Sequence, residues 1–234
     1  HNRNKMLLRK REQETLYMLK EEQQWKEIFP QKTIVALNNT VTGMKEIVSY
    51  IPTMTKIELK EKYAIKEERI LIFCARFTSP YRRVDLLLQT IEKLDRERFG
   101  FIIIGDGVNK PDFTKYTNVH DFGAVYDVEV KRELFAIADI YYQPGWVGLS
   151  IVEAMGYGLP VFTFIRSAET LQCVEYSYIE DGMNGRIFET VNECVEVINE
   201  SKDEEIAEMG EKAKALAKTL LAENMVNRAM SILE

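Results

Sequence analysis

The chain has 234 residues, of which 46% are hydrophobic and 29% charged, and its formal net charge at pH 7 is −6. This length and composition suffice for one sizeable core, and the negative charge disfavours broad nucleic-acid binding. No apolar run approaches the ~20 residues that cross a bilayer, and the charged N-terminus lacks the apolar segment of a secretory signal. Three widely separated cysteines are typical of reduced thiols, so we expect a cytoplasmic α/β protein.

Residues 1–66 differ from the remainder of the chain in charge and pattern. Residues 4–29 are charge-rich and predict an amphipathic helix whose apolar stripe comprises Leu8, Met18, Leu19, Trp25 and Phe29. The basic start of this helix is compatible with an anionic membrane surface, although a solvated helix end is the more common meaning of such a charge run. Residues 32–39 predict one strand and a turn, and Thr55 and Glu58 have the spacing of a capping box for a following helix.

Strand and helix patterns alternate from about residue 69 to residue 189. Short apolar runs predict strands at 70–75, 101–104, 140–142 and 161–165, and helical periodicity marks 84–94, 128–138 and a segment beginning near residue 150. Such alternation predicts a Rossmann-like parallel sheet with helices on both faces, whose loops converge at the carboxyl ends of the strands. The loops that we expect at this crevice carry Arg76, Arg82, Gly105, Gly123, Gly145 and Ser150. Further along, residues 180–186 have the composition of a hairpin-like turn before a short strand, and the end of the chain is helical.

The segment from Pro144 to Pro160, PGWVGLSIVEAMGYGLP, is the most informative part of the sequence. It joins two strand patterns through a glycine-rich turn and a helix start, where free backbone N–H groups and the helix dipole attract an anion. Glu153 would repel a phosphate but can accept hydrogen bonds from vicinal sugar hydroxyls, so the two features together suit a nucleoside diphosphate. From spacing alone, a capping box formed by Ser150 and Glu153, with a purely structural role, is the more common interpretation.

These motifs resemble the donor-binding half of the group 1 family of retaining GT-B glycosyltransferases. Glu153–Met155 and Gly158–Val161 match the second half of the family's donor-binding signature, whereas Gly145 stands where the family has its first Glu. The form PG-x-x-GLS-x-VEA is similar to a subgroup that includes many enzymes of bacterial surface polysaccharide synthesis. A Gly-Asp-Gly at 105–107 and a D-G-x-N-G at 181–185 resemble further family elements, which support the fold rather than the chemistry.

The resemblance implies roles for particular residues around the donor. Arg76 and Arg82 would offset the charge of the diphosphate, and Glu153 would bind the ribose hydroxyls. The remaining nucleotide- and donor-binding positions would be Gly123, Ala124, Gly145, Gly148, Leu149 and Ser150. The resemblance assigns no residue of this chain as a catalytic base or nucleophile, and it implies neither a metal nor another cofactor.

The resemblance also implies how the chain is organised. Residues 1–66 would form a helical segment and the crossover from a mostly missing N-terminal acceptor domain, and residues 67–234 would form the nucleotide-sugar-binding domain with its C-terminal helices. The full enzyme would move a hexose-type sugar from a nucleotide sugar to a hydroxyl of a saccharide, lipid-linked or protein acceptor, in the cytoplasm or at the inner face of the membrane. Two alternatives stay open, a nucleotide-sugar epimerase of GT-B architecture and a non-catalytic nucleotide-binding or assembly module.

Overall fold

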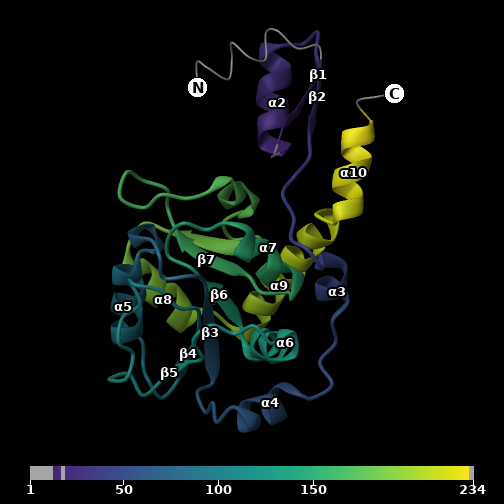
Figure 1. The fold of residues 1–234 in the computed structure, drawn as a ribbon. Helices are drawn as coiled ribbons and strands as arrows, with labels where there is room; N and C mark the ends of the chain where they lie inside the picture. The colour runs from purple at the N-terminus through teal and green to yellow at the C-terminus, as the bar shows by residue number, and fades with distance from the viewer. Residues whose placement is uncertain (1–12, 17–18, 232–234) are drawn as a thin grey trace.

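A computed structural model describes residues 13–16 and 19–231 of the chain, with side chains from residue 22 onward. Its main body is a six-stranded parallel sheet with helices on both faces (Figure 1). The strands are β3 (Arg69–Cys74), β4 (Phe99–Ile104), β5 (Val119–Asp121), β6 (Ile140–Tyr142), β7 (Val161–Phe164) and β8 (Gly185–Phe188). The Rossmann-like α/β fold predicted from the sequence is therefore confirmed.

The order of the strands determines where a crevice opens in this sheet. The order is β5-β4-β3-β6-β7-β8, so the chain runs outward from β3 to β5 and then crosses back to β6 on the other side. Strands β3 and β6 are paired in parallel, with Leu71 beside Ile140 and Ile72 beside Tyr141. Because the connections after these two strands leave in opposite directions, they open a crevice at the carboxyl edge, which is where open α/β sheets bind their ligands.

Alternate side chains of the central strands bury two separate cores. Ile70 and Ile72 of β3 join the core on one face, whereas Leu71 and Phe73 join the core on the other. The first face is covered by α3 (Met44–Ser49), α4 (Lys56–Lys62), α6 (Val128–Ile137), α7 (Leu149–Gly156) and α9 (Asp203–Thr219). The second face is covered by α5 (Val84–Lys93), α8 (Val191–Glu200) and the start of α9. Burial on both faces explains why the strands are continuous apolar runs in the sequence.

The N-terminal segment forms a small lobe that stands apart from the main body in Figure 1. Strand β1 (Gln13–Leu16) pairs in parallel with β2 (Thr33–Ala36), and helix α2 (Leu19–Ile28) lies between them in the chain. The strand predicted within residues 32–39 is therefore confirmed. The prediction of one helix over residues 4–29 is wrong for β1, because pairing with β2 outweighs the weak helical preference of so short a segment.

The apolar stripe predicted for this segment is present in part. Trp25 and Phe29 are buried and stack with ring centroids 6.0 Å apart, and Ile34 of β2 completes a small core. Leu8, Met18 and the side chain of Leu19 lie outside the described residues.

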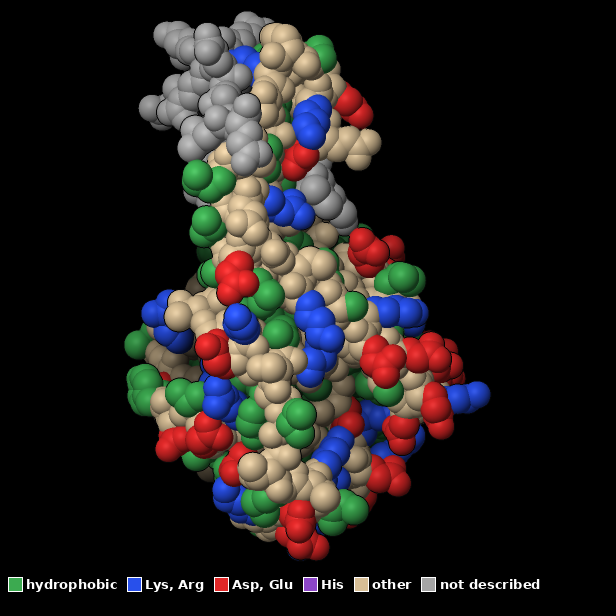
Figure 2. Space-filling view, turned by 90° about the vertical axis from the view of Figure 1, so that its right-hand side faces the viewer, with side chains coloured by type: hydrophobic (Ala, Val, Ile, Leu, Met, Phe, Trp, Pro, Cys, Tyr) green, Lys and Arg blue, Asp and Glu red, His purple; other side chains and the backbone are tan. Residues whose placement is uncertain are grey.

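The small lobe joins the main body through a narrow neck, which Figure 2 shows from the side. Helix α10 (Ala222–Met230) runs beside the neck, and its Arg228 Nη1 donates a hydrogen bond to the Ala36 carbonyl oxygen at 3.2 Å. Lys and Arg side chains are interspersed with Asp and Glu over most of the face seen in Figure 2. Among the residues that the structure describes, no helix is both long and apolar enough to cross a membrane.

The two predicted turn motifs outside the crevice are both present. The capping box of α4 is present, since the Thr55 side chain accepts from the Glu58 N–H and the Glu58 carboxylate accepts from the Thr55 N–H at 2.7 Å. The turn before β8 and the short strand that follows it are also present, and β8 lies parallel to β7 with Val161 beside Gly185. Glycine is required at position 185, since a Cβ atom there would lie 2.1 Å from the Val161 carbonyl oxygen.

Candidate functional site

The loops that follow β3 and β6 meet at the crevice between these strands. The loop after β3 contains a short 3-10 helix, η1 (Pro80–Arg82), and Arg82 Nη1 donates a hydrogen bond to the Trp146 carbonyl oxygen at 2.8 Å. The rings of Tyr81 and Trp146 stack with their centroids 4.9 Å apart and their planes at 18°. Two loops that are far apart in the sequence therefore form one wall of the crevice.

Gly145 is a point of close approach between these loops. A Cβ atom there would lie 2.5 Å from the carbonyl oxygen of Tyr81 and 2.7 Å from Cγ of Arg83. A backbone oxygen cannot move aside as the tip of a side chain can, so any larger residue requires η1 to shift. The lack of the family's first Glu at this position is therefore coupled to the path of the β3 loop.

The turn after β6 has an unusual backbone conformation at Trp146. Its φ of 53° is left-handed, which is uncommon for a bulky residue. Its N–H donates to the Leu171 carbonyl oxygen at 2.8 Å, and its own carbonyl oxygen accepts a second bond from the Gln143 side chain at 2.8 Å. Gln143 is fully buried, and its Oε1 accepts from Ser150 Oγ at 2.9 Å. The loops after β3, β6 and β7 are thus fastened to one another and to the start of α7.

The start of α7 excludes the capping-box interpretation of Ser150 and Glu153. The N-cap of α7 is Gly148, which makes no side-chain cap, so Ser150 lies inside the first turn and bonds to Gln143 instead. Among the described residues, the N–H groups of Gly148, Leu149 and Ser150 have no hydrogen-bond partner. Three unpaired donors at the positive end of a helix are the elements of an anion-binding site.

Glu153 forms an ion pair rather than a helix cap. Its Oε2 lies 2.8 Å from Nζ of Lys131 on α6, and the two side chains are 18% and 27% exposed. Burial lowers the pKa of Lys131, but the charge of the Glu153 carboxylate and its hydrogen bond act against burial, and the pKa lies above its ordinary value. A lysine on a different helix is therefore the partner of the carboxylate that the sequence singled out.

Two cations lie near the crevice without a carboxylate partner among the described residues. Arg76 follows β3, is exposed, and makes no ion pair or hydrogen bond within that part of the chain. Burial lowers the pKa of the Arg82 guanidinium below its ordinary value, and the like charge of Arg76 lowers it further. The buried Nε of Arg82 has no hydrogen-bond partner among the described side chains and backbone groups. An anion bound beside Arg76 and Arg82 would offset the repulsion between their charges.

The loop after β5 carries two of the predicted donor-binding positions, Gly123 and Ala124. Gly123 has a left-handed φ of 63°, and its carbonyl oxygen accepts from the Gly105 N–H at 2.7 Å, which joins the loops after β4 and β5. No atom lies within 4 Å of a Cβ atom placed at Gly123, and Ala124 is exposed, so both face open space. His120 of β5 hydrogen-bonds to the Glu67 side chain at 2.9 Å.

Sequence reasoning missed two residues that shape the site. Gln143 directly follows the β6 strand, and a buried amide at that position organises the turn that follows it. The sequence feature that could have indicated this role is a polar residue between an apolar strand and a glycine-rich turn. Lys131 had no comparable signal, because helical periodicity does not tell which of the polar side chains of α6 faces α7.

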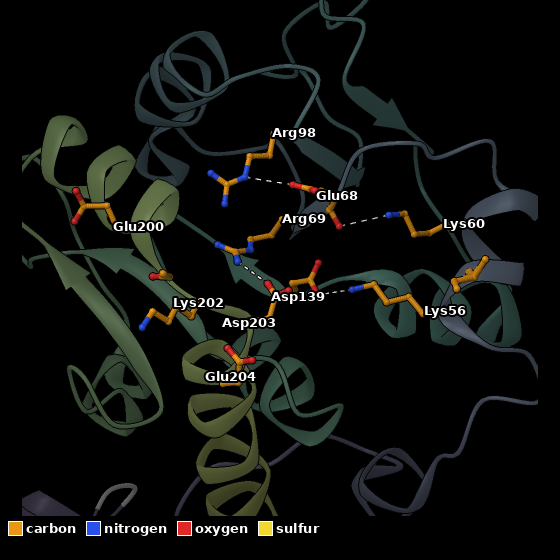
Figure 3. A pocket seen from close by; sticks show the side chains of 12 residues that line it. Lys56, Lys60, Glu68, Arg69, Arg98, Asp139, Glu200, Lys202, Asp203 and Glu204 are labelled. Atoms are coloured by element: carbon orange, nitrogen blue, oxygen red, sulfur yellow. Dashed lines mark hydrogen bonds and ion pairs between the residues drawn. The ribbon is translucent and has the colours of Figure 1, made fainter.

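A cavity of about 680 Å³ lies at the opposite, amino-terminal edge of the sheet (Figure 3). It is bounded by the beginnings of β3, β4 and β6, by α4 and by the junction of α8 with α9. Three ion pairs cross it: Arg69–Asp203, Arg98–Glu68 and Lys56–Asp139. Because its cations are matched by carboxylates, this cavity offers no excess charge to a nucleotide, and its network ties the helices to the sheet.

Comparison with known proteins agrees with this architecture. The chain is 19% identical to TarM with a TM-score of 0.67, covering 94% of this chain and 43% of TarM. It is 16% identical to Anabaena Alr3699/HepE in complex with UDP and glucose, with a TM-score of 0.65, covering 94% and 61% of the two chains. For WaaG, a glycosyltransferase involved in lipopolysaccharide biosynthesis, the identity is 21% and the TM-score 0.63, covering 93% and 62%. These likenesses show the fold.

Sequence comparison identifies the family. The chain is 30% identical over 153 residues to an uncharacterized 41.2 kDa protein in the cps region of Klebsiella pneumoniae, covering 62% of this chain and 40% of that protein. It thus spans less than two thirds of the length of the relatives named here. A profile of the family described as "Glycosyl transferases group 1" matches residues 68–201, which is more than half of the chain. The chain therefore belongs to the group 1 family of glycosyl transferases.

Proposed function

We propose that this chain binds the donor of a glycosyltransferase that moves a sugar from a nucleoside diphosphate to a hydroxyl acceptor. The observation that supports this most is the crevice between β3 and β6, where unpaired amides at the start of α7 lie on the same sheet edge as two arginines without carboxylate partners. Donors of both kinds suit a diphosphate, whose charge grows as the sugar leaves.

Each site residue has a task in this proposal. Arg76, Arg82 and the amides of Leu149 and Ser150 bind the diphosphate, and Glu153 accepts hydrogen bonds from the ribose hydroxyls. Gly123, Ala124, Gly145 and Gly148 line the remainder of the donor site. The arginines and the helix start supply positive charge that other enzymes take from a cation, so the proposed reaction needs no metal.

We propose the finer features of the reaction on the basis of the family resemblance and of the relatives. Retention of the anomeric configuration is expected from the resemblance of the donor-binding motif. The HepE structure contains UDP and glucose, which favours a hexose donor, and the cps-region relative and WaaG favour a role in the synthesis of a bacterial polysaccharide or glycoconjugate.

The proposed organisation places residues 67–234 around the donor and residues 1–66 in the crossover from an acceptor-binding domain. A saccharide, lipid-linked or protein acceptor would approach from that side, with peripheral contact to the inner face of a membrane. In this proposal the chain alone binds nucleotides and turns over little donor.

Calorimetric titration with UDP, GDP and ADP, in magnesium and in EDTA, tests the proposal. We expect micromolar-to-millimolar binding of one nucleotide that persists in EDTA. The nucleoside diphosphate that binds then identifies the donor base, and NMR of the product that the full enzyme, with its acceptor-binding domain, forms from the corresponding hexose donor reports the anomeric configuration. Failure of all three nucleotides to bind would contradict the proposal, and binding that requires magnesium would contradict its metal-independent form.

A further inference from the structure

We propose that Lys131 is a positioning residue, which holds the Glu153 carboxylate for the ribose and cancels its charge beside the diphosphate. The inference rests on the function proposed above and adds to it a residue outside the donor-binding motif. Lys131 lies on α6, which follows β5, and Glu153 lies on α7, which follows β6. The ion pair therefore joins two helices from different parts of the sheet.

The geometry of the pair leaves half of the carboxylate available. Nζ of Lys131 contacts Oε2 of Glu153 at 2.8 Å, and Oε1 has no hydrogen-bond partner among the described residues. Both side chains are partly exposed, so the pair is accessible to solvent rather than sealed in the core. A carboxylate with one oxygen fixed by a cation loses rotational freedom, and its second oxygen is presented in one direction.

Lys131 also has an electrostatic effect, because it neutralises the charge of Glu153. An isolated carboxylate in the second turn of α7 would repel a diphosphate bound at the start of the same helix. Burial raises the pKa of the neighbouring Cys74 thiol to about 12, so this thiol stays neutral and Lys131 is the counter-ion of Glu153. With Lys131 present, the Lys131–Glu153 pair is neutral and the positive charge of the arginines is left for the phosphates.

A purely structural role does not explain the pair. Helix α6 already packs against the end of α7, where the rings of Phe135 and of Tyr157, the C-cap of α7, lie 4.8 Å apart. Partly exposed ion pairs contribute little to stability. Another such pair, Lys62–Glu133, also involves α6 at 2.5 Å but joins it to α4, and it provides a matched control.

The test compares nucleotides that lack one ribose hydroxyl. The nucleoside diphosphate that the wild-type chain binds among UDP, GDP and ADP is titrated beside its 2′-deoxy and 3′-deoxy forms. The proteins are the wild type, Lys131→Met, Lys131→Gln, Lys131→Arg and the control Lys62→Met, each with its unfolding temperature. We expect the wild type to bind at least one deoxy form about tenfold more weakly.

Removal of the Lys131 charge should reduce this deoxy penalty to about twofold, while Lys131→Arg and Lys62→Met retain most of it. Lys131→Met should also weaken binding of the nucleoside diphosphate more than that of the monophosphate.

An unchanged deoxy penalty in folded Lys131→Met or Lys131→Gln would overturn this inference but not the proposed function. Nucleotide binding without any deoxy penalty in the wild type would remove the ribose role of Glu153 and this inference with it. Absence of all nucleotide binding would overturn the proposed function as well.

Discussion

At the scale of single residues, Gly145 shows how one position fixes the shape of the crevice. The family's first Glu cannot be restored there without moving the β3 loop, because the Tyr81 carbonyl oxygen and the Arg83 side chain occupy its place. A Gly145→Glu variant would alter the loop and the charge together.

Replacement of Gly145 by alanine should destabilise the protein by about 1–3 kcal/mol, since its Cβ would lie 2.5 Å from a backbone oxygen. Urea unfolding measures the loss. Gly148→Ala is the matched control in the same turn, because a Cβ there would meet only the Cys173 side chain at an ordinary 3.7 Å. Equal stability of the two variants would show that the loops do not approach as closely as described.

The buried pair Glu67–His120 gives a prediction about acid stability. Burial raises the pKa of Glu67, but the hydrogen bonds from His120 and the backbone outweigh it and hold the pKa below its ordinary value of 4.5. The folded state therefore binds this proton less readily than the unfolded chain, so Glu67 stabilises the protein above that ordinary value and the contribution is lost as the pH falls. Between about pH 6 and about pH 3, the free energy of unfolding should fall less steeply in Glu67→Gln than in the wild type. The exposed Glu97→Gln should follow the wild type, and parallel curves for Glu67→Gln would refute the assignment.

At the scale of elements, the two edges of the sheet differ in how their polar and charged groups are paired. At the carboxyl edge, loops and the start of α7 leave donors and cations without carboxylate partners among the described residues. At the amino edge, ion pairs fasten α4 and the α8–α9 junction to the strands (Figure 3). The cavity at the amino edge is crossed by ion pairs, whereas the proposed ligand site is distinguished by its unpaired donors and cations within the described part of the chain.

Substitutions at Asp139 test experimentally which edge of the sheet binds the nucleotide. Its Oδ2 accepts from the buried Ile70 N–H at 2.8 Å, and its Oδ1 pairs with Lys56. Asp139→Ala should cost about 1–3 kcal/mol of stability because it leaves that N–H unsatisfied, whereas Lys56→Met should cost less than about 1 kcal/mol. Neither should change nucleotide affinity at a temperature where both are folded. A nucleotide affinity that falls with Asp139→Ala would place the ligand at the amino edge.

At the scale of the whole molecule, the main body could be predicted from the sequence because its strands are buried on both faces and therefore appear as short apolar runs. The positions of the crevice loops followed from the same pattern, since parallel strands end at one edge. Strand β1 could not be predicted, because its conformation depends on pairing with β2 rather than on its own residues. The partner of Glu153 could not be predicted either, because it is set by how α6 packs beside α7.

The most direct test of the central claim is the dissociation constant of the bound nucleoside diphosphate for the wild type, Glu153→Ala and Asp139→Ala. Placement of the nucleotide at the carboxyl edge predicts at least about tenfold weaker binding to Glu153→Ala and wild-type affinity for folded Asp139→Ala. Equal affinity of Glu153→Ala and the wild type would contradict it, and so would a selective loss of binding in Asp139→Ala.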